Sequence, residues 1–122
     1  MPVVVEIVGA DMDALEAVFD YFTAVDARFS TYKTDSEISK INRGEIREGE
    51  YSTDMNEVFA LAEQTHEESG GFFSIRRPDG SIDPSGLVKG WAIQKAAELV
   101  NGMGYKHYFL DVGGDIQSRG LD

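Results

Sequence analysis

An apolar stripe near the amino terminus most constrains what this chain can fold into. Asp11 is a suitable N-cap, because its carboxylate can accept hydrogen bonds from the free N–H groups of a first helical turn. Beyond it, apolar side chains recur at the spacings of one helix face, at Leu15, Val18, Phe19, Phe22, Val25 and Phe29. The stripe predicts a long helix from Asp11 to about Phe29 that faces a core.

Strand patterns lie on both sides of the helical part of the chain. Val3–Val8 is apolar and β-branched, which is typical of a strand. The segment KHYFLDV, residues 106–112, predicts a second strand, and Asp115–Ser118 begins a third. Gly113-Gly114 separates these two as a turn or bulge.

Three further helices are predicted between the strands, because apolar residues return to helical spacing after capping signals. They are a short helix capped by Ser36 with Ile38 and Ile41, a longer one opened by Asp54 and Glu57 and ended by Gly70-Gly71, and Leu87–Met103 followed by Gly104. The apolar face of the last helix is expected at Leu87, Trp91, Leu99 and Met103. Strands and helices in this order predict an α+β fold.

The charge balance excludes one class of function. The 122 residues include 22 acidic and 11 basic side chains, a net charge of -11. This argues against binding to a nucleic-acid backbone, but it leaves room for a local phosphate site. With no cysteine, thiolate nucleophiles and sulfur-based metal sites are excluded.

The amino terminus shows no targeting pattern. MPVVVEIV lacks a basic segment, a lipobox and a long apolar run. The chain as given is therefore expected to be cytoplasmic, with no membrane segment.

The stretch DPSGLVKGWAIQKAAEL, Asp83–Leu99, places glycines and a lysine at the entrance of the last predicted helix. A glycine there lets the chain turn sharply, so an ordinary helix entrance is one interpretation. The other is an anion site, because the free N–H groups and the positive dipole end of a helix attract phosphate, and a lysine reinforces them. The residues by themselves leave both interpretations open.

Four segments resemble successive motifs of the ApbE family, in the same order and across nearly the whole chain. They are DARFSTYKTDSEISKIN (26–42), SGGFFSI (69–75), DPSGLVKGWAIQKAAELV (83–100) and LDVGGDIQSRG (110–120). The resemblance implies an ApbE-like mixed sheet with packed helices, in a single domain over residues 1–122. It also implies a fold that is incomplete at the C-terminus, because family members continue well beyond this length.

Members of the ApbE family are FAD:protein FMN transferases, so the resemblance implies a Mg²⁺-dependent enzyme with FAD as its substrate. Such an enzyme transfers FMN to a threonine or serine of a target protein as a phosphoester and releases AMP. We expect the chain to be inactive without the C-terminal half that completes the family's metal site. Two alternatives stay open: a non-catalytic FAD-binding module, and one subunit of a split enzyme whose partner chain pairs with the C-terminal sheet edge.

The resemblance assigns the helix entrance to the diphosphate of FAD. Asp83 and Lys89 match residues that contact FAD, and Gly86 matches a residue whose backbone carbonyl is a metal ligand. This agrees with the preference of Mg²⁺ for oxygen ligands and with the use of a lysine to stabilise charge on a leaving phosphate. A plain helix entrance remains the alternative.

Other residues are placed at the flavin by the resemblance. Tyr32 matches a tyrosine at the flavin, where its ring would stack on the isoalloxazine; the alternative is an exposed loop tyrosine. The further candidates for contact with FAD are Met1, Phe72, Phe73, Ser74 and Asp115. Ser74 stands where the family has an aspartate, and a structural role is the alternative for Phe73 and Asp115. No catalytic residue is assigned, and neither histidine belongs to a metal-binding pair at helical spacing.

Overall fold

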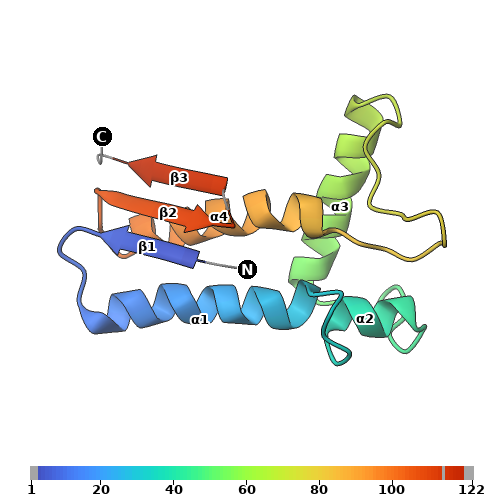
Figure 1. The fold of residues 1–122 in the computed structure, drawn as a ribbon, viewed down its shortest axis with the longest axis horizontal. Helices are drawn as coiled ribbons and strands as arrows, with labels where there is room; N and C mark the ends of the chain where they lie inside the picture. The colour runs from blue at the N-terminus through green and yellow to red at the C-terminus, as the bar shows by residue number, and fades with distance from the viewer. Residues whose placement is uncertain (1–2, 114, 120–122) are drawn as a thin grey trace. The chain divides into compact units, whose positions relative to one another are not determined.

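The computed structural model describes residues 3–113 and 115–119. The elements follow one another as β1 (Val3–Ile7), α1 (Met12–Phe29), α2 (Glu37–Asn42), α3 (Thr53–Glu68), α4 (Ser85–Gly102), β2 (Tyr108–Val112) and β3 (Asp115–Arg119) (Figure 1). This order confirms the predicted α+β class. The chain divides into two compact units, one of residues 1–26 and 89–122 and the other of residues 27–88.

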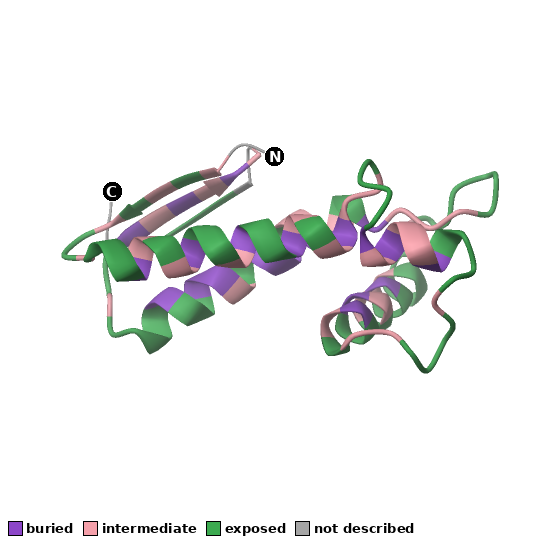
Figure 2. Ribbon diagram, turned by 90° about the horizontal axis from the view of Figure 1, so that it is seen from below, coloured by how far each residue is buried: buried purple, intermediate pink, exposed green. Residues whose placement is uncertain are grey.

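The first unit is built on a three-stranded antiparallel sheet in the order β1-β2-β3. The strand register pairs Val5 with Leu110 and Leu110 with Gln117. Tyr108, Leu110 and Val112 alternate along β2 and are buried, as expected for a central strand with one face on a core. The unit's parts of α1 and α4 lie along one face of this sheet (Figure 2).

The buried face of α1 differs in part from the predicted stripe. Val18, Phe22, Val25 and Phe29 are buried as predicted, and Ala14 joins them. Leu15 is half-buried, and Phe19 is 44% exposed, so its prediction as a core residue was wrong. The cause is geometric: Phe19 follows Val18 directly, and about 100° of helical rotation turns it away from the buried face.

The buried face of α4 also differs from the prediction. Trp91 is buried, but Leu99 and Met103 are 37% and 36% exposed, so their placement on the buried face was wrong. Besides Trp91 and Ile93, the buried residues of the helix are smaller ones, at Val88, Ala92, Ala96, Ala97 and Val100. The prediction followed the large apolar side chains and so chose the wrong face. It gave little weight to alanine, which is only weakly hydrophobic.

The second unit contains α2, α3 and a long loop that leads into α4. Ser36 caps α2, as predicted, and its side chain accepts a hydrogen bond from the N–H of Ser39. The N-cap of α3 is Ser52, which accepts from the N–H of Met55. The predicted capping box at Asp54 was therefore wrong by two residues, and Asp54 lies inside the first turn.

The loop before α4 contains a small hairpin. Gly80 N–H donates to the carbonyl of Arg77, and Arg77 N–H donates to the carbonyl of Ser81. The sequence Arg77-Pro78-Asp79-Gly80 suits this turn, because proline presets the second position and glycine accepts the positive φ of +87° at the fourth. Arg76 and Ile82 form a bridge across it, so part of the expected loop is ordered by antiparallel pairing.

Candidate functional site

Lys89 and Gly113 bring two of the predicted motifs together within the first unit. Lys89 belongs to the DPSGLVKG segment, and Gly113 begins the turn of the GGD segment. The Lys89 Nζ donates a hydrogen bond to the Gly113 carbonyl at 2.9 Å. This contact joins α4 to the β2–β3 turn. An ammonium carries three N–H donors, so Lys89 can hold this carbonyl and still donate to a ligand.

A glycine is required at position 113 for two reasons. Its φ of +58° lies in the left-handed region that disfavours other residues. A Cβ built there would lie 2.8 Å from Cε and 3.1 Å from Nζ of Lys89. At Gly113 the absence of a side chain therefore leaves room for the lysine side chain.

Asp83 lies in the second unit and already has partners. Its Oδ1 accepts hydrogen bonds from Ser85 N–H at 3.1 Å and from Ser85 Oγ at 2.7 Å. Its Oδ2 pairs with Nη2 of Arg77 at 3.0 Å. Partial burial raises the pKa of Asp83, but the bonds from Ser85 and the charge of Arg77 outweigh it and hold that pKa below its usual range. Asp83 is therefore an ionised group at the start of α4.

Arg77 was not among the residues predicted for the site, although the residues that follow it predict a turn. The Pro-Asp-Gly run after Arg77 predicts a tight turn, and such a turn folds the arginine back toward the residues that follow. The same turn lowers the pKa of Asp79 through hydrogen bonds from Ser81. The guanidinium of Arg77 is thus a second cation close to the predicted diphosphate motif.

Gly86 lies inside α4, which begins two residues before the predicted Leu87. In regular helix geometry its carbonyl points along the axis toward the N–H four residues later. No group of three or more His, Asp or Glu side chains that could hold a metal ion occurs in the described ranges 3–113 and 115–119. A complete Mg²⁺ site needs more oxygen ligands than Gly86 supplies, and the Mg²⁺ role of Gly86 stays a prediction.

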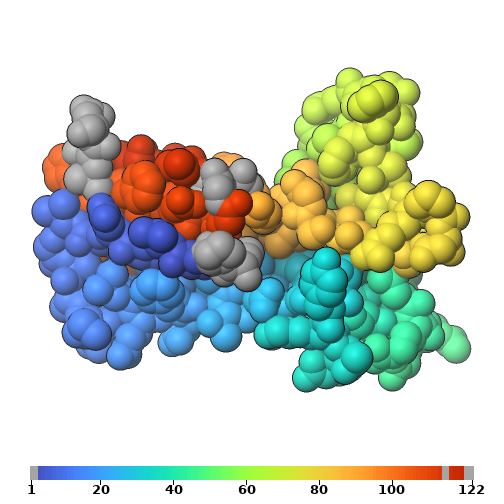
Figure 3. Space-filling view, in the orientation of Figure 1, coloured from blue at the N-terminus to red at the C-terminus, as the bar shows by residue number. Residues whose placement is uncertain are grey.

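Among the predicted flavin-binding residues whose side chains the structure describes, Tyr32 and Phe72 are the most exposed, both at 96%. Tyr32 lies in the segment 30–35 before α2, in the second unit. Figure 3 shows the surface that this light-blue to cyan part of the chain forms. The ring of Tyr32 is therefore accessible to a planar ligand, and the alternative of an unliganded loop tyrosine has the same geometry.

Phe72, Phe73 and Ser74 follow the C-terminal end of α3. Phe73 N–H donates to Ser69 Oγ at 2.9 Å, and Nδ1 of His66 lies 2.7 Å from the Phe73 carbonyl. The His66 side chain thus contributes to the order of this turn. Ser74 and His66 also line a cavity of about 470 Å³ with the aromatic pair Tyr51 and Phe59.

Tyr32 and Phe73 are connected to opposite ends of α3. Tyr32 lies a few residues before α2, whose first residue, Glu37, contacts Ser52 at the start of α3. Phe73 is bonded to Ser69 at the other end of that helix. The 16 residues of α3 rise by about 24 Å from one end to the other.

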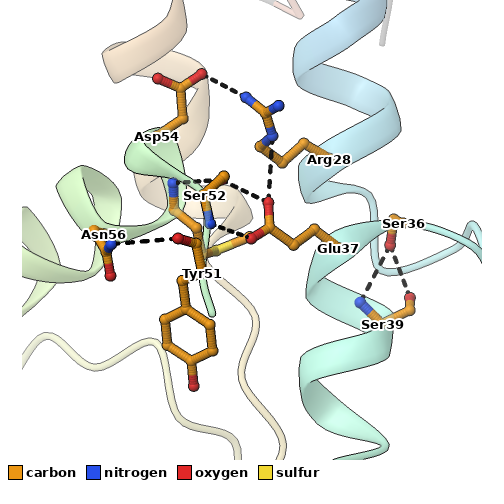
Figure 4. A network of polar contacts seen from close by, with 9 residues as sticks. Arg28, Ser36, Glu37, Ser39, Tyr51, Ser52, Asp54 and Asn56 are labelled. Atoms are coloured by element: carbon orange, nitrogen blue, oxygen red, sulfur yellow. Dashed lines mark hydrogen bonds and ion pairs between the residues drawn. The ribbon is translucent and has the colours of Figure 1, made fainter. Parts of the chain in front are cut away.

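A polar cluster links the ends of three helices in the second unit (Figure 4). Glu37 accepts from the N–H and Oγ of Ser52, both at 2.7 Å. Arg28 at the end of α1 pairs with Glu37 at 3.3 Å and with Asp54 at 2.6 Å. Glu37 therefore ties the start of α2 to the N-cap of α3.

The side chains of two predicted site residues, Met1 and Asp115, lie outside the described part of the structure. Met1 lies outside the described residues. The backbone of Asp115 begins β3, but its side chain is likewise outside the description. Their roles stay predictions, as does the single-domain organisation.

No helix in the described part of the chain combines the length and the apolar character needed to cross a membrane.

Comparison with known proteins identifies relatives of known activity. The chain is 30% identical over 53 residues to an FAD:protein FMN transferase of Vibrio cholerae, an alignment that covers 43% of this chain and 16% of that protein. The flavin transferase ApbE of Vibrio cholerae superposes with a TM-score of 0.83 at 19% identity, over 98% of this chain and 56% of that one. The apo form of the flavinyl transferase ApbE of Pseudomonas stutzeri gives a TM-score of 0.81 at 15% identity, over 98% and 55%.

These similarities fix the fold and the family. The chain spans about half the length of the solved relatives it matches. The ApbE family profile matches residues 1–77 and 74–122, which together cover the chain from end to end. The protein belongs to the ApbE family.

Proposed function

We propose that this chain forms the FAD-binding part of an FAD:protein FMN transferase. The observation that carries the proposal is the contact between Lys89 and the Gly113 carbonyl, which joins two motifs that the resemblance assigns to FAD. The name of the Vibrio cholerae relative, FAD:protein FMN transferase, supports the same reaction. FAD is the substrate, and the partner is a protein that carries the acceptor threonine or serine.

In the proposed reaction, the acceptor hydroxyl attacks the phosphorus atom on the FMN side of the diphosphate. The bond to the bridging oxygen breaks, AMP leaves with that oxygen, and the hydroxyl proton is released. Lys89 would donate to the diphosphate, where a fixed cation stabilises developing negative charge. Tyr32 would stack on the isoalloxazine, and Mg²⁺ with Gly86 as one ligand remains an expectation from the resemblance.

A binding comparison tests the role of Lys89. Lys89→Gln should weaken FAD binding by about 1–3 kcal/mol, the scale of a hydrogen bond to a charged group, when flavin fluorescence is followed during titration. Riboflavin lacks phosphate and should bind both proteins alike. Lys95→Gln makes the same change further along α4, where Lys95 faces Glu98, and should leave FAD affinity unchanged. Equal loss for FAD and riboflavin would remove Lys89 from the diphosphate.

AMP release separates the transferase from a binding module. We propose that residues 1–122 by themselves bind FAD without releasing AMP in the presence of Mg²⁺. The support is that the relatives have nearly twice this length and that the described residues hold no cluster of metal-binding side chains. Steady AMP production by these residues would contradict the proposal and require a complete catalytic site within them.

A further inference from the structure

Tyr32 lies in a short segment whose shape is set by hydrogen bonds to one buried serine. Its side chain is 96% exposed, so the backbone of residues 30–35 determines where the ring lies. The Tyr32 N–H donates to Ser30 Oγ at 3.3 Å, close to the limit for such a bond. The order of this segment must therefore come from the groups that bind its carbonyls.

Ser36 is the residue that binds those carbonyls. It is 0% exposed, and its Oγ lies 2.6 Å from the Ser30 carbonyl and 3.0 Å from the Lys33 carbonyl. Ser39 Oγ donates to the same Lys33 carbonyl at 2.7 Å. Ser30 and Lys33 stand on either side of Tyr32 in the chain, so the hydroxyl of Ser36 closes the backbone around the tyrosine.

The helix that carries Ser36 is itself held in place. Glu37, the next residue, receives two hydrogen bonds from Ser52 and an ion pair from Arg28. Figure 4 shows these contacts beside the Ser36–Ser39 pair. The anchor for the tyrosine segment is therefore fixed to the ends of two neighbouring helices, which makes it more than a local cap.

We propose that Ser36 is a positioning residue for flavin binding, because it holds the segment that presents Tyr32. The inference rests on the proposed function, because it takes FAD to stack on Tyr32. The hydrogen bonds of Ser36 are observed in the structure. A ring that is already oriented loses less freedom when a ligand stacks on it, so its binding is stronger. Removing the Ser36 hydroxyl would release the Ser30 carbonyl. The Lys33 carbonyl would keep its bonds from Ser39 Oγ and from the Ser36 N–H, so the segment would be looser and binding would have to order it further.

A double-mutant cycle with Ser36→Ala and Tyr32→Ala tests this. Ser36→Ala should weaken both FAD and riboflavin binding by about three- to tenfold, the cost of ordering one or two side chains. In the Tyr32→Ala background the same change should have little further effect, because the residue through which Ser36 acts is gone. Titrations are made well below the melting temperature of each variant.

Asp11→Ala is the control. Asp11 is also an N-cap, with a bond from Ala14 N–H at 2.8 Å, and it lies in the first unit at the start of α1. Its removal should lower the melting temperature and leave flavin affinity unchanged. As a readout without flavin, trypsin should cut after Lys33 faster in Ser36→Ala than in Asp11→Ala, because only the first change removes a hydrogen bond from that segment.

The outcomes separate the inference from the proposed function. A wild-type protein that binds no flavin contradicts both the proposed function and the flavin role of Ser36. If the wild type binds flavin but Ser36→Ala binds equally well, only the inference is overturned. It is also overturned if the losses from Ser36→Ala and Tyr32→Ala simply add, since a general loss of stability would then explain the effect.

Discussion

Different kinds of interaction stand out within each of the two units of this chain. In the first unit, the buried side chains of β2, Tyr108, Leu110 and Val112, are apolar or aromatic and lie in the middle of a hydrogen-bonded sheet. In the second, the ends of helices are tied by ion pairs and serine hydroxyls around Glu37 and Ser36. The second unit also buries apolar side chains, among them Ile38, Met55 and Val58, so its polar contacts add to burial and do not replace it.

This difference has a functional consequence. Apolar burial is roughly proportional to area and tolerates small displacements, whereas a hydrogen bond weakens steeply when its geometry changes. The second unit exposes Tyr32 and Phe72 on segments that serines hold in place. Exposed aromatic side chains can be presented in one conformation only if their backbone is fixed in this way.

The largest effect is expected from breaking the apolar core of the first unit. Leu110 is fully buried in the central strand, so Leu110→Ala should lower the free energy of unfolding by about 2–5 kcal/mol. Ile116→Ala, on the edge strand β3 and 58% exposed, should change it by no more than about 0.5 kcal/mol. Urea unfolding measures the free energy of unfolding of both variants. Similar losses would contradict the assignment of Leu110 to the core and of Ile116 to the surface.

The next effect concerns the polar cluster of the second unit. The Glu37 side chain is only 14% exposed and accepts two bonds from Ser52. Glu37→Gln removes the negative charge opposite Arg28. It also replaces one acceptor oxygen by an NH₂ group, which cannot accept the hydrogen bonds that Ser52 donates. We therefore expect a loss of about 1–3 kcal/mol in unfolding free energy.

Glu45→Gln is the matched control for this change. Glu45 also pairs with an arginine, Arg43, but its side chain is 55% exposed. An exposed pair contributes about 0–1 kcal/mol, so the control should be nearly neutral. If both variants lost the same stability, the cluster around Glu37 would be no more than a surface ion pair.

A pair of glycines tests the turn in the candidate site. Gly113→Ala should cost about 1–2 kcal/mol, because its positive φ is unfavourable for alanine, and it should weaken FAD binding because the new Cβ meets the Lys89 side chain. In Gly86→Ala a Cβ meets no atom within 4 Å, so this change should be neutral or stabilise the helix by at most about 1 kcal/mol. Thermal unfolding and FAD titration distinguish the two.

The smallest effect is a dependence on pH at the start of α4. The pKa of Asp83 is lowered in the folded protein, so its contribution to stability is complete above its unfolded pKa of about 3.9. It is lost as the pH falls through the lower folded pKa. Asp83→Asn should therefore show a shallower loss of stability below about pH 4 than the wild type. Parallel stability curves for the two proteins would contradict this.

Local signals predicted most of the secondary structure. Caps at Asp11 and Ser36 are confirmed by hydrogen bonds to Ala14 and Ser39, because a cap is a contact between residues three apart and needs no tertiary information. The start of α3 was displaced because Ser52 and Asp54 are both acceptable caps. The choice between them followed from Glu37, which is distant in sequence and binds Ser52.

The candidate site was predicted as a set of motifs, without the contacts among them. Lys89 was expected beside a phosphate, but its contact with Gly113 joins residues 24 positions apart. Arg77 was missed because its pairing with Asp83 depends on the turn between them. The contacts of Tyr32, Phe72 and the other predicted residues with FAD remain predictions.

The sequence alone determined the class of the fold, the order of its elements and its family, because periodicity, caps and motifs are local or linear properties. The tertiary structure decided which faces of α1 and α4 are buried, since burial depends on what packs against a helix and the apolar pattern left Phe19 and Leu99 on the wrong side. It also decided that the Gly113 carbonyl receives Lys89 and that Ser36 holds the segment with Tyr32. Such hydrogen bonds form only between atoms that the folded backbone brings within about 3 Å, and no spacing in the sequence states that distance.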